Sequence, residues 1–398
     1  MYREWNQFAV HHEPPRELLT KLRLPVKTLT SPGPTNCSER VLQSLRNQVL
    51  GHLHPEILQI MDEIKAGLQY AFQTRNRLTL VVSGAGHSGI EACLDNILEP
   101  GDKILIVKSG IWAVRAADKA TRIGAQVVFL ETGHDKSATL EELENALREH
   151  EPTAVYTVQA DSSVGLKQPL EGFGELVHRY NALLMVDAVA SLGGEPFFMD
   201  LWGVDVAFAA SQKALGAPPG LAPISFSPRA EEKLFRRRTP PTSFYFDMKH
   251  LGAYWRCFDN PRKVYHHTIS STLLYGLREA LAEIAEEGLV ERWSRHSAAA
   301  RRLRQGLELR GLQSYVKNPR YQLSTVITIE LPPGVDEETI IQRAMNGYRV
   351  EIAPGLGSTA GKVLRIGLLG INATFEIVDL VLRALDAGLR NAQTRSSL

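Results

Sequence analysis

Short apolar runs alternate with amphipathic stretches between about residues 78 and 225. The apolar runs predict strands at 79–82, 103–108, 126–130, 154–158, 183–186 and 204–208. Helical patterns lie between them at 86–98, 112–123 and 170–180, and Thr139 with Glu142 forms a capping box that predicts a helix to about residue 149. Strands buried on both faces read as continuous Val, Ile and Leu runs. The pattern therefore predicts an α/β fold, with a mostly parallel sheet covered by helices.

The pattern changes after about residue 270. Residues 271–309 form a long Ala- and Glu-rich helical stretch, in which Gly288 is a possible break. Strands at 325–331 and 363–367 follow, with helices from Asp336 and from about Glu376. We therefore predict an N-terminal arm over 1–30, a large α/β domain over 31–287 and a small α+β domain over 288–398.

Composition and charge narrow the class of protein. The chain has 398 residues, with 45 Lys and Arg against 44 Asp and Glu. This balance disfavours a nucleic-acid-binding protein, which usually carries a basic excess. No apolar run reaches the length of a membrane span, and three scattered cysteines disfavour a disulfide framework. We expect a globular intracellular protein.

The two ends of the chain bear on its compartment. The first 25 residues have no apolar segment of the kind found in secretory signals. The last three residues, Ser396-Ser397-Leu398, resemble a C-terminal peroxisomal address, although Ser397 stands where a basic residue is usual. A peroxisomal location is the prediction, with mitochondrial and cytosolic locations as alternatives.

A glycine-rich turn predicts a phosphate site. Residues 83–89, SGAGHSG, follow a predicted strand, open a predicted helix and contain G-x-G-x-x-G. Backbone N–H groups at a helix N-terminus bind phosphate. A dinucleotide site would also need an acid at the carboxyl end of the next strand, but that strand ends in Lys108, and Asp102 lies at its other end. We therefore favour a phosphate site without a ribose and keep a Rossmann-type oxidoreductase as a weaker alternative.

Two further residues follow predicted strands. Asp187 ends the apolar run 183–186, so it should project from the carboxyl end of a buried strand, where ligands bind in open α/β sheets. A buried carboxylate needs a cationic partner, and the protonated ring nitrogen of pyridoxal phosphate (PLP) is such a partner. Lys213 comes just after the strand at 204–208, in an apolar setting that suits Schiff-base chemistry.

These features occur together in one known family. From about Pro25 to its end, the chain resembles the alanine–glyoxylate (serine–pyruvate) aminotransferases of the class V PLP-dependent group. The resemblance rests on motifs at 32–36 (PGPTN), 86–87 (GH), 159–163 (QADSS), 186–194 (VDAVASLGG), 211–215 (SQKAL), 265–268 (YHHT) and 364–367 (LRIG). It implies a fold-type-I PLP enzyme.

The resemblance also implies a set of residues around the cofactor. Lys213 would form a Schiff base with PLP and later move a proton, and Asp187 would pair with the ring nitrogen. Trp112 would stack on the ring, although a plain core aromatic is the alternative for this residue. The remaining cofactor contacts would be Ser162 near the phenolic oxygen and Gly86, His87 and Gln212 at the phosphate.

Substrate and subunit contacts follow from the same resemblance. Arg365 would bind the substrate carboxylate, for which a guanidinium is the natural bidentate partner. Tyr265 and Thr268 would reach the phosphate of the neighbouring subunit, which implies a homodimer. Gly51, followed by His52, matches the alanine–glyoxylate type, whereas related 3-hydroxykynurenine transaminases carry Ser-Asn at this place. We expect L-alanine, with L-serine as a second donor, and glyoxylate as substrates, in a ping-pong mechanism; 3-hydroxykynurenine transaminase is the alternative within the family.

Some residues depart from the family pattern, and some suggest other chemistry. Ser31, Ala85, Val164 and Pro354 stand where the family usually has Gly, Ser, Thr and Gly. Pro354 matters most, because proline fixes φ and lacks an N–H near the substrate's side of the site. The histidine pairs at 52/54 and 266/267 lack acids in ligand spacing, so we expect no metal. A catalytically silent homologue is the non-enzymatic alternative, but the presence of both Lys213 and Asp187 argues against it.

Overall fold

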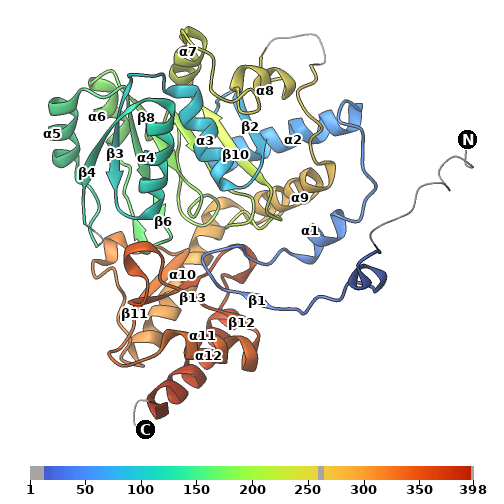
Figure 1. The fold of residues 1–398 in the computed structure, drawn as a ribbon, viewed down its shortest axis with the longest axis vertical. Coiled ribbons are helices and arrows are strands. Elements are labelled where there is room, and N and C mark those ends of the chain that lie inside the picture. Colours follow the sequence, from blue (N-terminus) through green and yellow to red (C-terminus); the bar gives the residue numbers. More distant parts are fainter. Residues whose placement is uncertain (1–12, 134, 259–263, 396–398) are drawn as a thin grey trace, which may run out of the picture.

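A computed structural model describes residues 13–133, 135–258 and 264–395 (Figure 1). Its main sheet has seven strands in the order β2-β10-β9-β8-β5-β3-β4, and only β10 runs antiparallel to its neighbours. The strands are β2 (Leu78–Ser83), β3 (Lys103–Lys108), β4 (Gln126–Glu131), β5 (Ala154–Val158), β8 (Leu183–Asp187), β9 (Val206–Phe208) and β10 (Leu221–Phe226). The predicted α/β fold with a mostly parallel sheet is confirmed, and each predicted strand lies within two residues of the observed one.

Helices pack against this sheet. They are α2 (Pro55–Phe72), α3 (Gly86–Ile97), α4 (Ile111–Ile123), α5 (Leu140–His150), α6 (Phe173–Arg179), α7 (Pro228–Arg236) and α8 (Met248–Tyr254). Helix α9 (Ser271–Glu287) packs against α2 and α1 (Glu39–Ser44). The predicted capping box at the start of α5 is confirmed, because Thr139 accepts from the N–H of Glu142 and Glu142 accepts from the N–H of Thr139. Helix α6 begins later than predicted, after Gly172 turns the chain in the left-handed region at φ 81°.

Among the elements that were not predicted from the sequence, two matter most for the architecture. Helix α2 begins with Pro55 at its first turn and buries an apolar face that includes Ile57, Met61 and Ile64 against α9. Strand β10 is fully buried between β2 and β9. Its antiparallel direction reverses the chain inside an otherwise parallel sheet, which a βαβ pattern cannot foresee.

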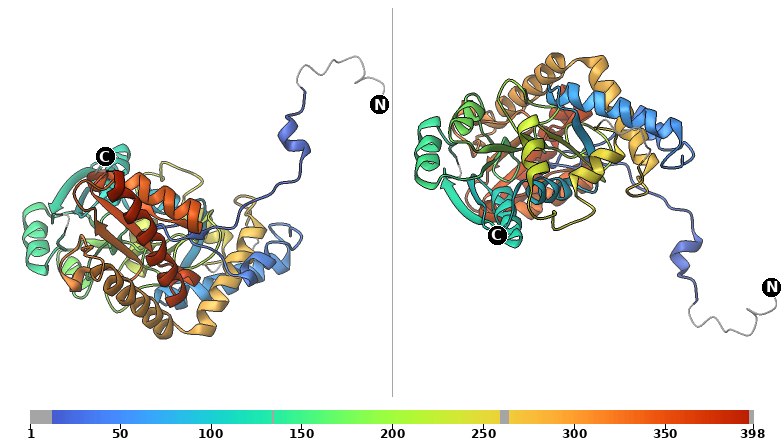
Figure 2. Two further views of the ribbon diagram at one scale, coloured as in Figure 1. Left: turned by 90° about the horizontal axis from the view of Figure 1, so that it is seen from below. Right: turned by 90° about the horizontal axis from the view of Figure 1, so that it is seen from above.

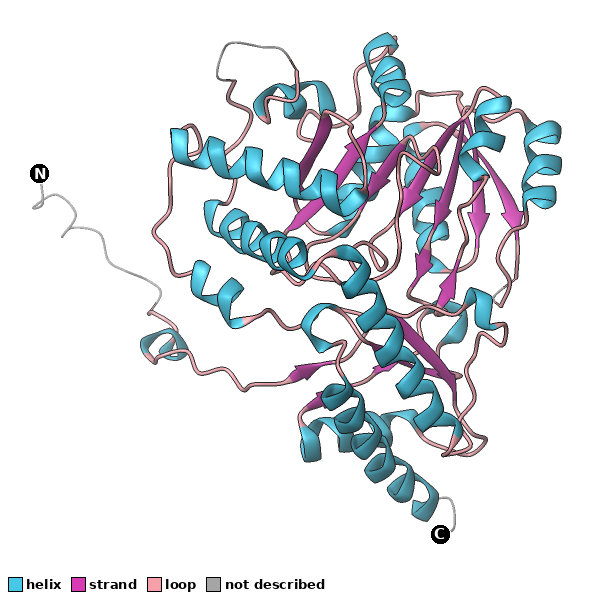
Figure 3. Cartoon of the chain, turned by 180° about the vertical axis from the view of Figure 1, so that it is seen from behind, coloured by secondary structure: helices cyan, strands magenta, loops and turns pink. Residues whose placement is uncertain are grey.

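A second, smaller group of elements follows Gly288, which separates α9 from α10 at φ 82°, as predicted (Figure 3). Its sheet has the order β11-β14-β13, and β14 is antiparallel to both neighbours. The elements are α10 (Leu289–Glu308), β11 (Val326–Glu330), α11 (Glu337–Tyr348), β12 (Val350–Glu351), β13 (Ala353–Pro354), β14 (Val363–Gly367) and α12 (Phe375–Arg395). One buried apolar cluster runs from Val41 to Leu289 and another from Ala299 to Leu385. The change of core lies just after the predicted domain boundary at residue 287.

The N-terminal segment joins the smaller group rather than ending as a free arm at residue 30. Strand β1 (Thr28–Leu29) pairs in parallel with β12, and the hydroxyl of Thr30 donates to the carbonyl of Glu351 at 2.7 Å. Residues 13–27 extend away from the body in every view (Figures 1 and 2). Within the described ranges, no helix combines the length and apolar character that a membrane span requires.

Candidate active site

A cavity lies at the carboxyl ends of the parallel strands β2, β5, β8 and β9. It holds about 540 Å³ of empty space, its open mouth included. The residues that line it are Ala85, Gly86, His87, Ile90, Trp112, Ala160, Ser162, Asp187, Val189, Ala190, Gln212 and Lys213. The seven residues that the resemblance assigns to the cofactor of their own chain therefore lie around one cavity, although their segments are spread over more than 120 residues of the chain.

Asp187 ends β8 with its carboxylate almost fully buried. One oxygen accepts from the backbone N–H of Val189 at 2.8 Å, and the other accepts from the hydroxyl of Tyr156 at 3.3 Å. Burial, helped by the nearby charge of Asp161, raises the pKa of Asp187 to about 7. The charged carboxylate is therefore costly here unless a cation faces it.

Lys213 follows β9 and reaches the same cavity. Its Nζ donates to the carbonyl oxygen of Pro32. Burial, together with the charge of Arg365, lowers the pKa of Lys213 to about 8. Gly33 has φ 117°, and a Cβ there would lie 2.5 Å from Nζ, so only glycine fits beside this lysine. An amine with this pKa is partly unprotonated near neutral pH, as a nucleophile must be.

The turn from β2 into α3 presents bare backbone to the cavity. Gly84 has φ 152°, and its N–H donates to the carbonyl of Gly220 at 2.8 Å. A Cβ on Gly86 would lie 3.3 Å from the Cβ of Ala210. The first N–H groups of α3 have no partner within the helix, and the helix dipole favours an anion there. This end of the cavity is suited to a phosphate group.

Two polar side chains complete this end of the cavity. His87 accepts at Nε2 from Nη1 of Arg115 at 3.3 Å, so its neutral ring carries the proton on Nδ1. Gln212 has its Oε1 buried without a hydrogen-bond partner among the described residues. A buried amide oxygen without a partner is costly, which points to a group from outside the chain.

Trp112 is fixed by a hydrogen bond at the start of α4. Its Nε1 donates to Oγ of Ser162 at 3.0 Å. Its ring meets the ring of His87 edge-on, with centroids 5.8 Å apart. The indole is only half-buried and lines the cavity, a position that differs from that of an ordinary core aromatic.

Arg365 projects from β14 in the smaller group of elements. Its Nε donates to the carbonyl of Pro354 at 2.8 Å, and its Nη1 donates to the carbonyl of Ser162 at 3.0 Å. The side chain is largely buried, and burial lowers its pKa. Pro354 departs from the family pattern, but its carbonyl still accepts from the arginine, so the missing N–H does not disturb this contact.

Arg365 bonds to Ser162 but is not itself among the residues that line the cavity. Three further predicted site residues, Gly51, Tyr265 and Thr268, do not line it either. Gly51 donates its N–H to Nδ1 of His54 at 3.2 Å. Tyr265 is 57% exposed, and its hydroxyl lies 3.4 Å from Oγ1 of Thr268. The assignment of these three residues to substrate and to a neighbouring subunit's site stays a prediction.

The histidines at 266 and 267 form a chain of hydrogen bonds. His266 must donate from Nε2 to the carbonyl of Phe244 (3.3 Å), so its Nδ1 accepts from His267 (2.9 Å) when both rings are neutral. His267 then accepts at Nε2 from the hydroxyl of Ser83 at 2.7 Å. Burial lowers the pKa of His267 to about 4, so this arrangement persists at neutral pH. Among the described residues, no group of three or more His, Cys, Asp and Glu side chains is arranged to hold a metal ion.

Asp161 is a buried residue of the site that the sequence did not single out. It belongs to β6 (Ala160–Asp161), which pairs with β7 (Leu166–Lys167). Its carboxylate accepts from the N–H of Ser163 at 2.9 Å and from the hydroxyl of Ser109 at 3.1 Å, and burial raises its pKa. Its position three residues after the strand at 154–158 was the sequence feature that could have identified it.

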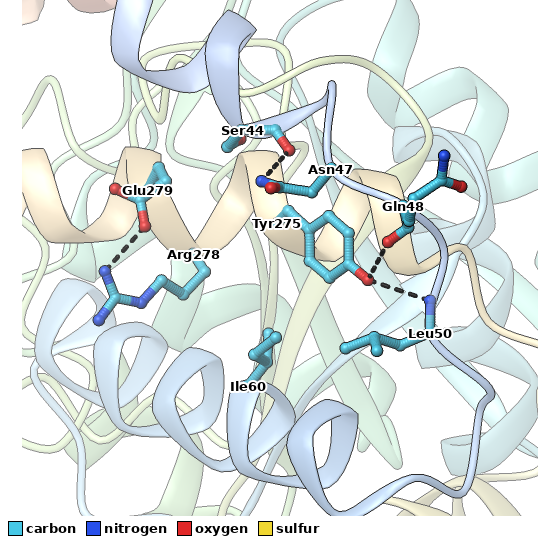
Figure 4. A pocket seen from close by; sticks show the side chains of 8 residues that line it. All are labelled: Ser44, Asn47, Gln48, Leu50, Ile60, Tyr275, Arg278 and Glu279. Carbon is cyan, nitrogen blue, oxygen red and sulfur yellow. Dashed lines mark hydrogen bonds and ion pairs between the residues drawn. The ribbon is translucent and has the colours of Figure 1, made fainter.

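A larger hollow lies away from this cavity, beside α1, α2 and α9 (Figure 4). The hydroxyl of Tyr275 donates to the carbonyl of Gln48 at 3.0 Å and accepts from the N–H of Leu50 at 3.1 Å. Arg278 donates to the carboxylate of Glu279 at 2.8 Å. These polar groups thus have hydrogen-bond partners within the chain. The described residues that line the hollow include no lysine or cysteine.

Known proteins share both the sequence and the fold. The family model for class V aminotransferases matches residues 28–381. Alanine–glyoxylate aminotransferase from Felis catus is 50% identical over 95% of this chain and 91% of its own length. The protein of the same name from Drosophila melanogaster is 49% identical over 96% of both chains. The crystal structure of alanine–glyoxylate aminotransferase from Nostoc sp. superposes with a TM-score of 0.91, with 43% identity, covering 95% of this chain and all of that one. The chain belongs to the class V aminotransferase family.

Proposed function

We propose that this protein is a PLP-dependent transaminase that moves the amino group of L-alanine, or of L-serine, to glyoxylate and so forms glycine. The observation that carries the proposal is the meeting of Asp187, Lys213 and the N-terminus of α3 around one cavity. The names of the relatives that are about 50% identical support the choice of reaction.

The groups in the cavity fit the cofactor. The buried carboxylate of Asp187 needs a cation, and a protonated pyridine nitrogen supplies one. The N–H groups of Gly86 and His87 fit a phosphate, and the unpartnered oxygen of Gln212 would gain a partner from a bound group. Trp112 offers a fixed aromatic face, and Ser162 a hydroxyl.

Each residue then has a chemical role. When bound, PLP withdraws electrons from the α-carbon of the amino acid. Lys213 would supply the amine that holds the cofactor and would carry the proton removed from the α-carbon. Asp187 would keep the ring nitrogen protonated. Tyr156 and Val189 hold the carboxylate of Asp187 in place.

Substrate choice rests on Arg365 and on the names of the relatives. The guanidinium would bind the carboxylate that the amino acid and the 2-oxo acid share. The name alanine–glyoxylate aminotransferase supports alanine and glyoxylate as the substrate pair, and serine and pyruvate are acids of similar size. The test is a direct comparison of donors with glyoxylate as the acceptor. L-alanine should give a kcat/KM at least about tenfold above that of 3-hydroxykynurenine, and the reverse order would favour the alternative within the family.

Assembly and location are further parts of the proposal. A homodimer would bring Tyr265 and Thr268 to the neighbouring cavity, and light scattering should then give twice the mass of one chain. A monomer with full activity would contradict this. Ser396-Ser397-Leu398 lie outside the described residues. If they form a peroxisomal address, deleting them should move a fluorescent fusion carrying the native C-terminus from peroxisomes to the cytosol, and mitochondrial or cytosolic signal from the intact fusion would contradict it.

A further inference from the structure

Thr359 lies beside Arg365 but has no role in the mechanism above. We propose that Thr359 is a positioning residue, which holds the two carbonyl acceptors of Arg365 at a fixed spacing and thereby sets the affinity for the substrate carboxylate. The inference rests on the proposed role of Arg365.

The two acceptors of Arg365 come from different parts of the molecule. Pro354 belongs to β13 in the smaller group of elements, and Ser162 follows β6 on the side of the large sheet. Bonds to Nε and Nη1 fix the plane of the guanidinium, and Nη2 takes part in none of the hydrogen bonds found among the described residues. The two carbonyls thus set the orientation of the guanidinium edge that would bind a carboxylate. This orientation is kept only if the segments of Pro354 and Ser162 keep their relative positions.

Thr359 contacts both of these segments. Its hydroxyl lies 3.1 Å from the carbonyl of Ser163, the residue directly after Ser162, and 3.0 Å from the carbonyl of Leu356, so its single proton is shared between the two segments. It also accepts from the N–H of Leu356 at 3.0 Å, which closes the turn that follows Pro354. On its backbone side, a Cβ on Gly355 would lie within 1.9 Å of the Thr359 carbonyl. The side chain of Thr359 thus bonds beside Ser162, and its backbone packs beside Pro354.

Loss of the hydroxyl would leave buried groups without partners. Thr359 and Ser163 are almost fully buried, and an unpaired buried N–H or C=O is costly. The segments would shift to recover hydrogen bonds, and the carbonyls of Ser162 and Pro354 would move relative to each other. Because the guanidinium of Arg365 is held by both carbonyls, its N–H groups would no longer be oriented to bind a carboxylate.

The test compares Thr359→Val, which keeps the shape but removes the hydroxyl, with Thr359→Ser, which keeps the hydroxyl. Thr359→Val should raise KM for L-alanine and for glyoxylate by about the same factor, roughly tenfold, as expected for a lost buried hydrogen bond. The rate of the half-reaction with ethylamine, which has no carboxylate, should not change. Thr359→Ser should stay within about threefold of the unaltered protein. Thr359→Ala gives the same comparison should the valine variant fail to fold.

Two results would overturn the inference. One is a Thr359→Val variant whose KM values match those of the unaltered protein while Arg365→Lys raises them. The other is a Thr359→Val variant whose half-reaction with ethylamine slows by as large a factor as its half-reaction with L-alanine, which would indicate general damage to the site. Unchanged KM values in Arg365→Lys would instead remove the proposed role of Arg365, and this inference with it.

Discussion

Ser162 and Arg365 meet across the two parts of the molecule through a hydrogen bond of 3.0 Å from Nη1 to the Ser162 carbonyl. The hydroxyl of the same serine accepts from the indole of Trp112. One residue thus fixes both the aromatic face on which the cofactor would lie and the arginine that would bind the substrate. A single turn of backbone at Ser162 would therefore set the distance between cofactor and substrate carboxylate.

Replacing Lys213 with alanine should abolish turnover. In the proposed mechanism the amine at this place would hold the cofactor and move the proton, so we expect kcat to fall by more than about 10³-fold. Lys317→Ala, which alters an exposed lysine paired with Glu330, should leave kcat unchanged. The check is steady-state pyruvate formation from L-alanine and glyoxylate, and full transamination by the Lys213 variant would contradict the mechanism.

Asp187→Asn should stabilise the cofactor-free protein at neutral and higher pH. The pKa of Asp187 is raised by burial from 3.8 to about 7, so between these values the folded chain keeps a proton that the unfolded chain has lost. Stability must therefore fall as pH rises from about 4 to about 7 and stay reduced above that.

The Asp187→Asn variant has no ionisable group at this position, so its stability does not fall in this way as pH rises. Its Tm at pH 8 should exceed that of the unaltered cofactor-free protein by at least about 3 °C, which corresponds to about 2.5 kcal/mol for a chain of this length. The gap should shrink at pH 5, and with PLP bound the order should reverse. Equal Tm values for the two proteins at pH 8 would mean that burial of the charged Asp187 carboxylate does not destabilise the cofactor-free protein.

Arg365→Lys should weaken the binding of both substrates. Lysine keeps the charge but cannot reach the carbonyls of Pro354 and Ser162 as a planar fork does. We expect KM for L-alanine and for glyoxylate to rise by about 10- to 100-fold, as for hydrogen bonds to charged groups. A rise for only one substrate would indicate that the two acids do not share this contact.

Trp112→Phe should weaken the cofactor without removing the aromatic face. The variant loses the hydrogen bond from Nε1 to Ser162, so the PLP dissociation constant should rise by about five- to tenfold. Trp293→Phe is the matched control, since its Nε1 is buried without a hydrogen-bond partner among the described residues. If the two substitutions raised the PLP dissociation constant by the same factor, the indole of Trp112 would have no specific role in cofactor binding.

The sequence located the strand ends but not the contacts between distant loops. Asp187 and Lys213 could be found because apolar runs end just before them, and parallel strands bring their carboxyl ends to one edge. The contact of Lys213 with Pro32 and Gly33, and the link from Thr359 to Ser163, join segments at least 180 residues apart. No local pattern encodes such contacts, because they depend on how the two sheets sit together.

The same limit explains the differences in the fold. The parallel pairing of β1 with β12 joins Thr28 to Val350, so the end of the predicted arm belongs to a sheet that only the folded chain defines. The reversed direction of β10 likewise depends on its neighbours in space. Gly288 and the capping box at Thr139 were predictable, because their signals lie within a few residues.

The proposed function requires one cavity to hold PLP and to pass an amino group from L-alanine to glyoxylate. The most direct test is the visible absorption spectrum of the purified protein with PLP, recorded alone, then with L-alanine, then with glyoxylate. We expect a cofactor band that L-alanine removes and glyoxylate restores. A band that ignores L-alanine but responds to another amino acid would contradict the proposed donor, and the absence of any cofactor band would contradict the proposed function itself.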